Sequence, residues 1–285
     1  MSATLQLLRP RQWTKNFFVL APLCFSFEYH SLNSVLHAII AMVSFICACC
    51  TTYIINDMYD VAEDRAHPIK QHRPLASGKI GIKRAFILAL ICLSVAFLLM
   101  LLFLPPICFI IISVYLFLQI AYNFKLKHTA LLDIVTIATG FVLRVLMGAY
   151  AINVPVSSWI VVTTFLLACF LGFGKRYHEI NVLEYAHCRV SLQRYSKTLL
   201  NQLISVSCAA TFLSYTLYAV DVGNELHKPE MIYSALFVIV GLFRYLQVLY
   251  VDEEGGEPER VLLHDSFFMV NCLMWLIVTM TILSY

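Results

Sequence analysis

Charged residues are scarce in this sequence. Only 13% of its 285 residues are charged, whereas 60% are hydrophobic. A soluble domain of this size carries about twice that share of charge, so the composition excludes an ordinary soluble fold. Apolar stretches of about 20 residues recur along the whole chain, which is typical of a polytopic helical membrane protein.

Several other features are missing from the chain. It contains no soluble domain, no low-complexity tract and no repeat of obvious period. The first apolar stretch follows basic residues, but Pro22 interrupts it and no clear cleavage site follows, which argues against a cleaved signal peptide. Among ten cysteines, Cys47 and Cys50 form one C-x-x-C pair inside an apolar run. A zinc site needs four converging ligands, so this single pair does not predict one.

The apolar stretches predict the architecture. We expect an all-α membrane protein with nine transmembrane helices in one bundle, forming a single domain over residues 1–285. Pro105-Pro106 separates the third helix from the fourth, because proline cannot continue a helix and disfavours helical geometry in the residue before it. The nine predicted spans are residues 14–29, 35–56, 82–103, 106–122, 131–152, 156–173, 198–221, 231–250 and 262–284.

The connections between these spans alternate in charge. Of 20 Lys and Arg residues, 17 lie in the N-terminal segment, in every second connection or at the adjoining helix edges. Cytoplasmic loops of membrane proteins carry such an excess of positive charge. We therefore expect the N-terminus and the basic loops in the cytoplasm and the C-terminus outside, in a bacterial inner (plasma) membrane.

One charged stretch follows the second span directly. It reads YIINDMYDVAEDRAHPIKQHRP, residues 53–74. If the helix continues, Asp57, Asp60 and Asp64 lie on one face and Asn56 lies beside them. Carboxylates in this arrangement suit Mg²⁺, which proteins hold with a few carboxylates and substrate phosphates. The alternative is a solvated helix end with surface ion pairs to Arg65 or Lys70.

A second polar cluster follows the sixth span. It reads GFGKRYHEINVLEYAH, residues 172–187. Lys175 and Arg176 are candidates for binding a phosphate, because arginine binds phosphate through two parallel hydrogen bonds. Glu179 is a candidate for assisting a metal. The alternative is an ordinary ion pair between Lys175 and Glu179, which lie four residues apart on one helical face.

These residues resemble a known family. The pattern Asn-Asp-x-x-Asp-x-x-x-Asp at 56–64, with Arg73-Pro74 after it, resembles the first motif of the UbiA superfamily of intramembrane prenyltransferases. Nine helices with catalytic loops on one side are also similar to that superfamily. Its members carry a second aspartate motif after the sixth helix. Here Lys175 stands at the first position of that motif and Glu179 at the second.

Further stretches resemble one branch, the decaprenyl-phosphate phosphoribosyltransferases. They are RPRQWTKN (9–16), YNFKLKH (122–128), GFVLR (140–144), GKRYHE (174–179) and GEPE (256–259), as well as the charged stretch itself. This resemblance implies Mg²⁺-dependent transfer of 5-phosphoribose from phosphoribosyl pyrophosphate to a polyprenyl phosphate. It also implies a role in arabinofuranose supply for a cell-envelope polysaccharide. We expect no nucleic-acid partner, and a homo-oligomer is compatible with the sequence.

The lysine substitution fits this donor. Phosphoribosyl pyrophosphate carries a pyrophosphate and a separate 5-phosphate, so Lys175 and Arg176 suit a second, metal-free phosphate. We expect Asp57, Asp60 and Asp64 to hold the metal, with Asn56 completing the catalytic group. The buried cation Arg144 favours a phosphate partner over pairing with Asp133 or Asp265. The predicted substrate-binding residues are Lys15, Asn16, Lys70, Arg73, Tyr122, Lys125, Lys127, Arg144, Lys175, Arg176, Tyr177 and Glu179.

Three other functions remain open at this point. A receptor or scaffold without chemistry would leave the three clustered aspartates unexplained. A prenyltransferase acting on an aromatic acceptor would carry two complete aspartate motifs, and the second is incomplete here. A secondary transporter would place its binding site near the middle of the membrane, whereas these carboxylates cluster at the end of a span.

Overall fold

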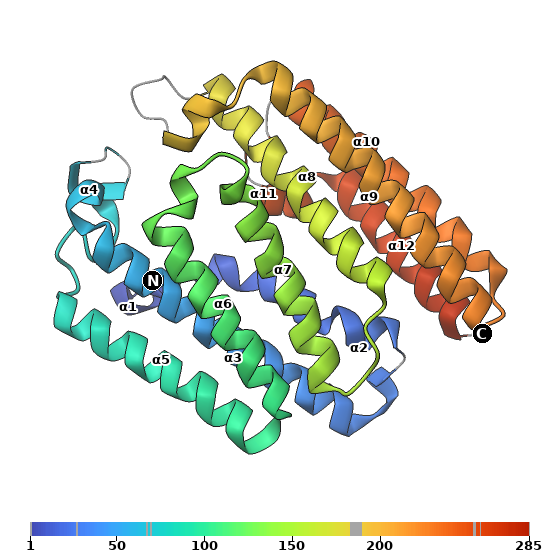
Figure 1. Cartoon of the computed structure of the whole chain (residues 1–285), viewed down its shortest axis with the longest axis horizontal. Coiled ribbons are helices and arrows are strands. Elements are labelled where there is room, and N and C mark those ends of the chain that lie inside the picture. Colours follow the sequence, from blue (N-terminus) through green and yellow to red (C-terminus); the bar gives the residue numbers. More distant parts are fainter. Residues whose placement is uncertain are drawn as a thin grey trace. The chain divides into compact units, whose positions relative to one another are not determined.

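Long apolar runs become long helices in the computed structural model of the chain (Figure 1). The structure describes residues 2–26, 28–66, 68, 70–182, 190–252, 255–256 and 258–284. Within these ranges there is no β-strand, and eight helices are long and apolar enough to cross a membrane. The predicted all-α polytopic fold is confirmed.

The eight long helices begin and end where the sequence changes character. Ser31 accepts a hydrogen bond from the Ser34 backbone N–H at 3.3 Å and caps the first of them, as a serine N-cap does. Pro106 is the first residue of another helix. A proline is tolerated there, because a backbone N–H at that position would have no partner within the helix. The helices are α3 (Leu32–Tyr59), α5 (Ile82–Phe103), α6 (Pro106–Phe124), α7 (Leu132–Ala151), α8 (Ser158–Val182), α9 (Lys197–Glu225), α10 (Ser234–Tyr250, preceded by the 3₁₀ helix η7, Pro229–Tyr233) and α12 (Ser266–Ser284).

The first predicted span takes a different form. Residues 14–29 do not make one transmembrane helix. The short helix α1 (Ala3–Leu7) precedes η1 (Pro10–Leu20), a 3₁₀ helix of 11 residues, which leads into α2 (Ala21–Phe25) and then η2 (Glu28–His30). Pro22 in the first turn of α2 lacks the N–H that would continue the hydrogen-bond ladder. The segment is therefore broken into short pieces.

This broken segment nevertheless runs the length of α3. At one end Arg9 forms an ion pair with Asp57, near the end of α3. At the other end Glu28 accepts a hydrogen bond from the Ser34 hydroxyl at 2.8 Å, near the start of α3. Asp57 and Ser34 are about 35 Å apart along a helix that rises 1.5 Å per residue. The part of the chain between Arg9 and Glu28 thus has contacts at both ends of α3, in addition to the eight long helices of the described residues.

The chain divides into two compact units. Unit 1 comprises residues 1–125 and 140–156, and unit 2 comprises residues 126–139 and 157–285. Helix α7 contributes its first two turns to unit 2 and its remainder to unit 1. The organisation of residues 1–285 as a single domain stays a prediction.

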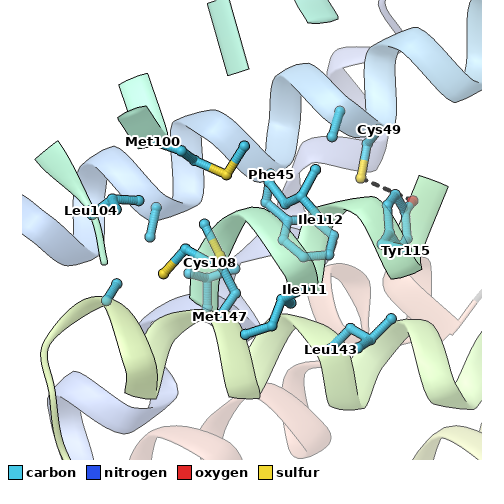
Figure 2. Close-up of a cluster of buried hydrophobic side chains, with 14 residues drawn as sticks. Phe45, Cys49, Met100, Leu104, Cys108, Ile111, Ile112, Tyr115, Leu143 and Met147 are labelled. Carbon is cyan, nitrogen blue, oxygen red and sulfur yellow. Dashed lines mark hydrogen bonds between the residues drawn. The ribbon is translucent and has the colours of Figure 1, made fainter. Parts of the chain in front are cut away.

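Unit 1 has a core built on α3. Helix α3 packs against α5 and α6, and small buried residues such as Ala41 and Ala48 allow close approach. Figure 2 shows Phe45, Ile112 and Met147 pointing toward one another from α3, α6 and α7. Unit 2 is built differently, from long α8–α9 and α10–α12 pairs.

A glycine permits a close helix contact in unit 1. A Cβ atom added at Gly148 would overlap the Val19 carbonyl oxygen, so η1 crosses α7 where α7 has no side chain. We expect Gly148→Ala to lower the free energy of unfolding by about 1–3 kcal/mol, because the backbone must move. Thermal unfolding in detergent measures this.

The matched control is Gly140→Ala on the same helix. An added Cβ there meets nothing nearer than the Arg144 Nη1 atom at 3.5 Å, an ordinary contact. Equal melting temperatures of the two variants would contradict the close crossing.

Candidate active site

The acidic motif lies where α3 ends. Helix α3 stops at Tyr59 and the short helix α4 (Val61–Ala66) begins after Asp60. The hydrogen-bond ladder continues across this break, from the Asp60 N–H to the Asn56 carbonyl at 2.9 Å and from the Asp64 N–H to the Asp60 carbonyl at 2.8 Å. The predicted shared face is therefore largely retained. Asp57 and Asp64 are both buried, and Asn56 and Asp60 are half-buried.

Two arginines neutralise the buried carboxylates. The Arg73 Nη1 atom lies 2.7 Å from Asp64 Oδ2 and 3.2 Å from Asp57 Oδ1. Arg9 forms a second ion pair with Asp57, and its guanidinium packs over the Tyr53 ring at 5.2 Å. The ion pairs of Asp57 and Asp64 are thus formed with Arg9 and Arg73. Arg65 donates to the Ala76 carbonyl at 3.2 Å.

Arg9 also has an unusual backbone. Its φ of 51° lies in the left-handed region, where a residue with a β-carbon is strained. Strain of this kind persists only where surrounding contacts hold it, and it clusters at functional sites. Arg9 lies in the RPRQWTKN stretch but is not among the residues predicted from the sequence to form the site.

The donor chemistry of this cluster suits magnesium. Asp57 and Asp64 both contact one nitrogen of Arg73, so their carboxylates face a single cationic position. In the described part of the chain, no three His, Cys, Asp or Glu side chains lie together as a preformed metal cage. Mg²⁺ needs no such cage, because one or two carboxylates with water and substrate phosphates suffice. The residues present therefore fit a Mg²⁺ ion that substrate helps to hold.

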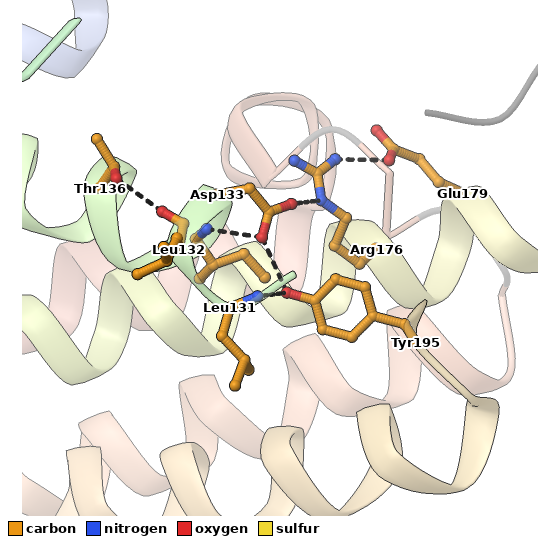
Figure 3. A network of polar contacts seen from close by, with 8 residues as sticks. Leu131, Leu132, Asp133, Thr136, Arg176, Glu179 and Tyr195 are labelled. Atoms are coloured by element: carbon orange, nitrogen blue, oxygen red, sulfur yellow. Dashed lines mark hydrogen bonds and ion pairs between the residues drawn. The ribbon is translucent and has the colours of Figure 1, made fainter. Parts of the chain in front are cut away.

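The cluster at the end of α8 is a buried network (Figure 3). Arg176 donates from Nε to Asp133 Oδ2 at 2.9 Å and from Nη1 to Glu179 at 2.6 Å. The Tyr195 hydroxyl donates to Asp133 Oδ1 at 2.9 Å and accepts from the Leu131 N–H at 2.7 Å. The Asp133 and Arg176 side chains are almost fully buried.

Helix α8 therefore points its two cations in different directions. Arg176 is turned inward and paired with two carboxylates, whereas Lys175 next to it is exposed. Glu179 pairs with Arg176, three residues away, which differs from the expected i,i+4 partner Lys175. Burial and the neighbouring Asp133 carboxylate raise the pKa of Tyr195, so it stays protonated and donates. Residues 183–187 of this predicted cluster lie outside the described residues.

Arg144 lies in the core of unit 1 with neutral partners. It donates to Asn16 Oδ1 at 3.0 Å, to the Gly140 carbonyl at 2.7 Å and to the Cys49 sulfur at 3.2 Å. The alternative acidic partners are used elsewhere, Asp133 by Arg176 and Asp265 by Arg244 at 2.6 Å. Arg144 and Asn16, both predicted to bind substrate, thus join η1, α3 and α7 through contacts with each other and the core.

Residues 17–273 match the model of the UbiA prenyltransferase family. The chain belongs to this family. It is 34% identical to the Mycolicibacterium smegmatis protein named decaprenyl-phosphate phosphoribosyltransferase, over 97% of this chain and 91% of that protein. It is 33% identical to the protein of the same name from Corynebacterium glutamicum, over 94% of this chain and 82% of that one. The family predicted from the sequence motifs is confirmed.

Solved structures show that the fold is also that of the UbiA family. A UbiA homologue from Archaeoglobus fulgidus, bound to GPP and Mg²⁺, superposes with a TM-score of 0.75 at 18% identity over the whole of both chains. A digeranylgeranylglyceryl phosphate synthase gives a TM-score of 0.68 at 17% identity, over 98% of this chain and 96% of that one. At such identities the likeness establishes the fold alone.

The remaining predicted site residues of this UbiA-family chain fall into two sets. Those in unit 1 are Lys15 in η1, Lys70 in η3 (Lys70–His72), Tyr122 in the last turn of α6, and Lys125, which follows α6. Those in unit 2 are Lys127 in η4 (Leu126–His128) and Tyr177 in α8, whose ring packs edge-on against Tyr250 at 5.0 Å. Their contacts with substrate stay predictions.

The structure adds Asp133 and Tyr195, which are not among the site residues predicted from the sequence. Asp133 is one acid at the start of an apolar run, and Tyr195 is 62 residues away from it along the chain. Nothing in either local pattern indicates the other.

Proposed function

We propose that this protein transfers 5-phosphoribose from phosphoribosyl pyrophosphate to a polyprenyl phosphate and releases pyrophosphate. The observation that carries this proposal is the end-to-end similarity, 34% identity over 97% of the chain, to a protein named decaprenyl-phosphate phosphoribosyltransferase. The substitution of Lys175 in the second motif supports it, because a lysine there suits a phosphate better than a metal ion.

The acidic cluster would bind the pyrophosphate end of the donor. Asp57, Asp60 and Asp64, with Asn56, would hold Mg²⁺, which when bound stabilises the negative charge that develops on the leaving pyrophosphate. Arg9 and Arg73 already lie against Asp57 and Asp64. Their guanidinium groups are therefore placed to contact pyrophosphate oxygens beside the carboxylates.

The end of α8 would bind the separate 5-phosphate. Lys175 is exposed, whereas Arg176 is buried between Asp133 and Glu179. We therefore assign the direct phosphate contact to Lys175 and a supporting role to Arg176. Lys127 on the connection before α7 is a further cation for this phosphate.

The transfer step needs no strong base. A lipid phosphate oxygen, already anionic at neutral pH, attacks C1 of the ribose. The new bond joins C1 to that oxygen while the bond from C1 to pyrophosphate breaks, so the electron pair leaves with pyrophosphate. Positive charge develops at C1 in the transition state, and the fixed cations around the pyrophosphate stabilise the opposite charge.

The membrane arrangement follows from the charge distribution. The exposed side chains of α5 and α12 are largely hydrophobic, as membrane helices require. We place the N-terminus, the acidic motif and the end of α8 on the cytoplasmic side of a bacterial plasma membrane, because 17 of 20 Lys and Arg residues flank that side. We also propose one functional domain over residues 1–285, which a homo-oligomer would leave unchanged.

Pyrophosphate release tests this proposal. Purified protein in detergent, given polyprenyl phosphate and phosphoribosyl pyrophosphate labelled in the ribose, should move label into lipid and release one pyrophosphate per label transferred. Chelation of divalent cations with EDTA should stop both, and added Mg²⁺ should restore both. Lipid labelling that persists at full rate in EDTA would contradict the magnesium assignment, and pyrophosphate release without lipid labelling would contradict the transfer.

A further inference from the structure

The network around Asp133 joins three separate parts of unit 2. Asp133 lies in the first turn of α7, Arg176 lies in the last two turns of α8, and Tyr195 precedes α9. The Asp133 carboxylate accepts hydrogen bonds from the Arg176 Nε, the Tyr195 hydroxyl and the Ile134 backbone N–H, at 2.9, 2.9 and 3.0 Å. Both of its oxygens are therefore used, as a fully buried carboxylate requires.

The same network holds a strained residue. Leu131 has a φ of 69°, in the left-handed region that is unfavourable for leucine. The Tyr195 hydroxyl accepts its backbone N–H at 2.7 Å. Tyr195 thereby fixes the turn between η4 and α7. Strain that is maintained by a buried network is a reason to look for a function.

The network also determines how the end of α8 is oriented. Arg176 is clamped from two sides by Asp133 and Glu179. Lys175 is the next residue on the same helix and is exposed. Because a helix is rigid, fixing the Arg176 side chain fixes the direction in which Lys175 leaves the helix.

We infer that Asp133 and Tyr195 are positioning residues for the donor phosphate. They touch no substrate. They hold Arg176 and the Leu131 turn, and through them the end of α8, so that Lys175 is already oriented toward a phosphate when the donor arrives. Such preorganisation improves the affinity for the donor, because less conformational entropy is lost when the donor binds. This inference rests on the proposed function, in which Lys175 contacts the 5-phosphate.

A double-mutant cycle between Tyr195 and Lys175 tests it. Tyr195→Phe removes one hydroxyl and keeps the ring. We expect it to raise the KM for phosphoribosyl pyrophosphate about tenfold, the effect of losing one buried hydrogen bond to a charged group, and to leave the KM for the lipid unchanged. In a Lys175→Gln background the same change should have almost no further effect, because the two residues act as one unit.

The control is Tyr250→Phe. Tyr250 donates to Asn201 at 3.0 Å on an exposed part of unit 2, and its loss should leave both KM values unchanged. Fold-changes that multiply in the double variant, or equal changes in both KM values, would overturn the inference while leaving the proposed function intact. A wild-type protein that transfers no phosphoribose would overturn both.

A second variant separates positioning from stability. Leu131→Gly tolerates the left-handed conformation without the tyrosine hydroxyl. Leu131 is 45% exposed, so this change opens no cavity. Added to Tyr195→Phe, it should recover part of the lost donor affinity. Recovery of the melting temperature without recovery of that KM would assign the network to stability alone and overturn the inference.

Discussion

Replacing Asp64 by asparagine should reduce phosphoribosyl transfer at least about a thousandfold in kcat/KM, the scale of losing a major electrostatic contribution to a transition state. Asn has nearly the same shape as Asp, so the change removes charge and little else. Asp64 is buried, shares Arg73 with Asp57 and belongs to the proposed magnesium cluster. Steady-state kinetics with phosphoribosyl pyrophosphate and polyprenyl phosphate measure the loss.

The neighbouring residue offers a matched control. Glu63 is the preceding acid on α4 and is exposed, so Glu63→Gln removes one negative charge from the same helix without touching the buried pair. It should retain nearly full activity. Asp64→Asn protein that runs as a monodisperse species and keeps more than about a tenth of wild-type kcat/KM would show that Asp64 does not support the metal.

The second large effect concerns Lys175. Changing it to alanine should lower kcat/KM for phosphoribosyl pyrophosphate about a hundredfold, because a lysine–phosphate contact is a charge-assisted hydrogen bond in a partly desolvated site. The loss should appear mainly in the KM for that donor and leave the KM for polyprenyl phosphate unchanged. Varying each substrate at saturating levels of the other separates the two effects.

Lys197 is the control residue for the loss of the positive charge of Lys175. It is an exposed lysine at the start of α9, on the same side as the end of α8. Lys197→Ala should leave both KM values near wild type. A Lys175→Ala variant that affected the lipid KM alone would show that Lys175 contacts the lipid acceptor and not the phosphoribosyl donor.

Local features of the sequence anticipated most of the helices. The turn at Pro105-Pro106 and the long apolar runs 82–103 and 106–122 depend on backbone chemistry and hydrophobicity that each segment carries itself. The first span was harder, because hydrophobicity indicates that a segment is apolar and does not distinguish one long helix from several short ones. Its passage along α3 became visible only through the contacts of Arg9 and Glu28.

The polar residues of the site were predicted unevenly. Clustered acids such as Asp57 and Asp64 are spaced so that they lie on one face of a helix, and this spacing can be read from a short stretch of sequence. The partners that hold them cannot, because Arg9 and Asp57 are 48 residues apart. The same holds for Arg176, whose pairing with Asp133, 43 residues away, no local pattern indicates. Such long-range pairings depend on packing that no single segment determines.

A comparison of two donors distinguishes phosphoribosyl transfer from prenyl transfer by this protein. One tube contains the protein, Mg²⁺, polyprenyl phosphate and labelled phosphoribosyl pyrophosphate. A second contains the protein, Mg²⁺, 4-hydroxybenzoate and a labelled prenyl diphosphate. We expect label in the lipid product of the first tube and no transfer in the second. Transfer in the second tube alone would show that Lys175 does not bind the 5-phosphate of a phosphoribosyl donor. The protein would then be a prenyltransferase with a degenerate second motif.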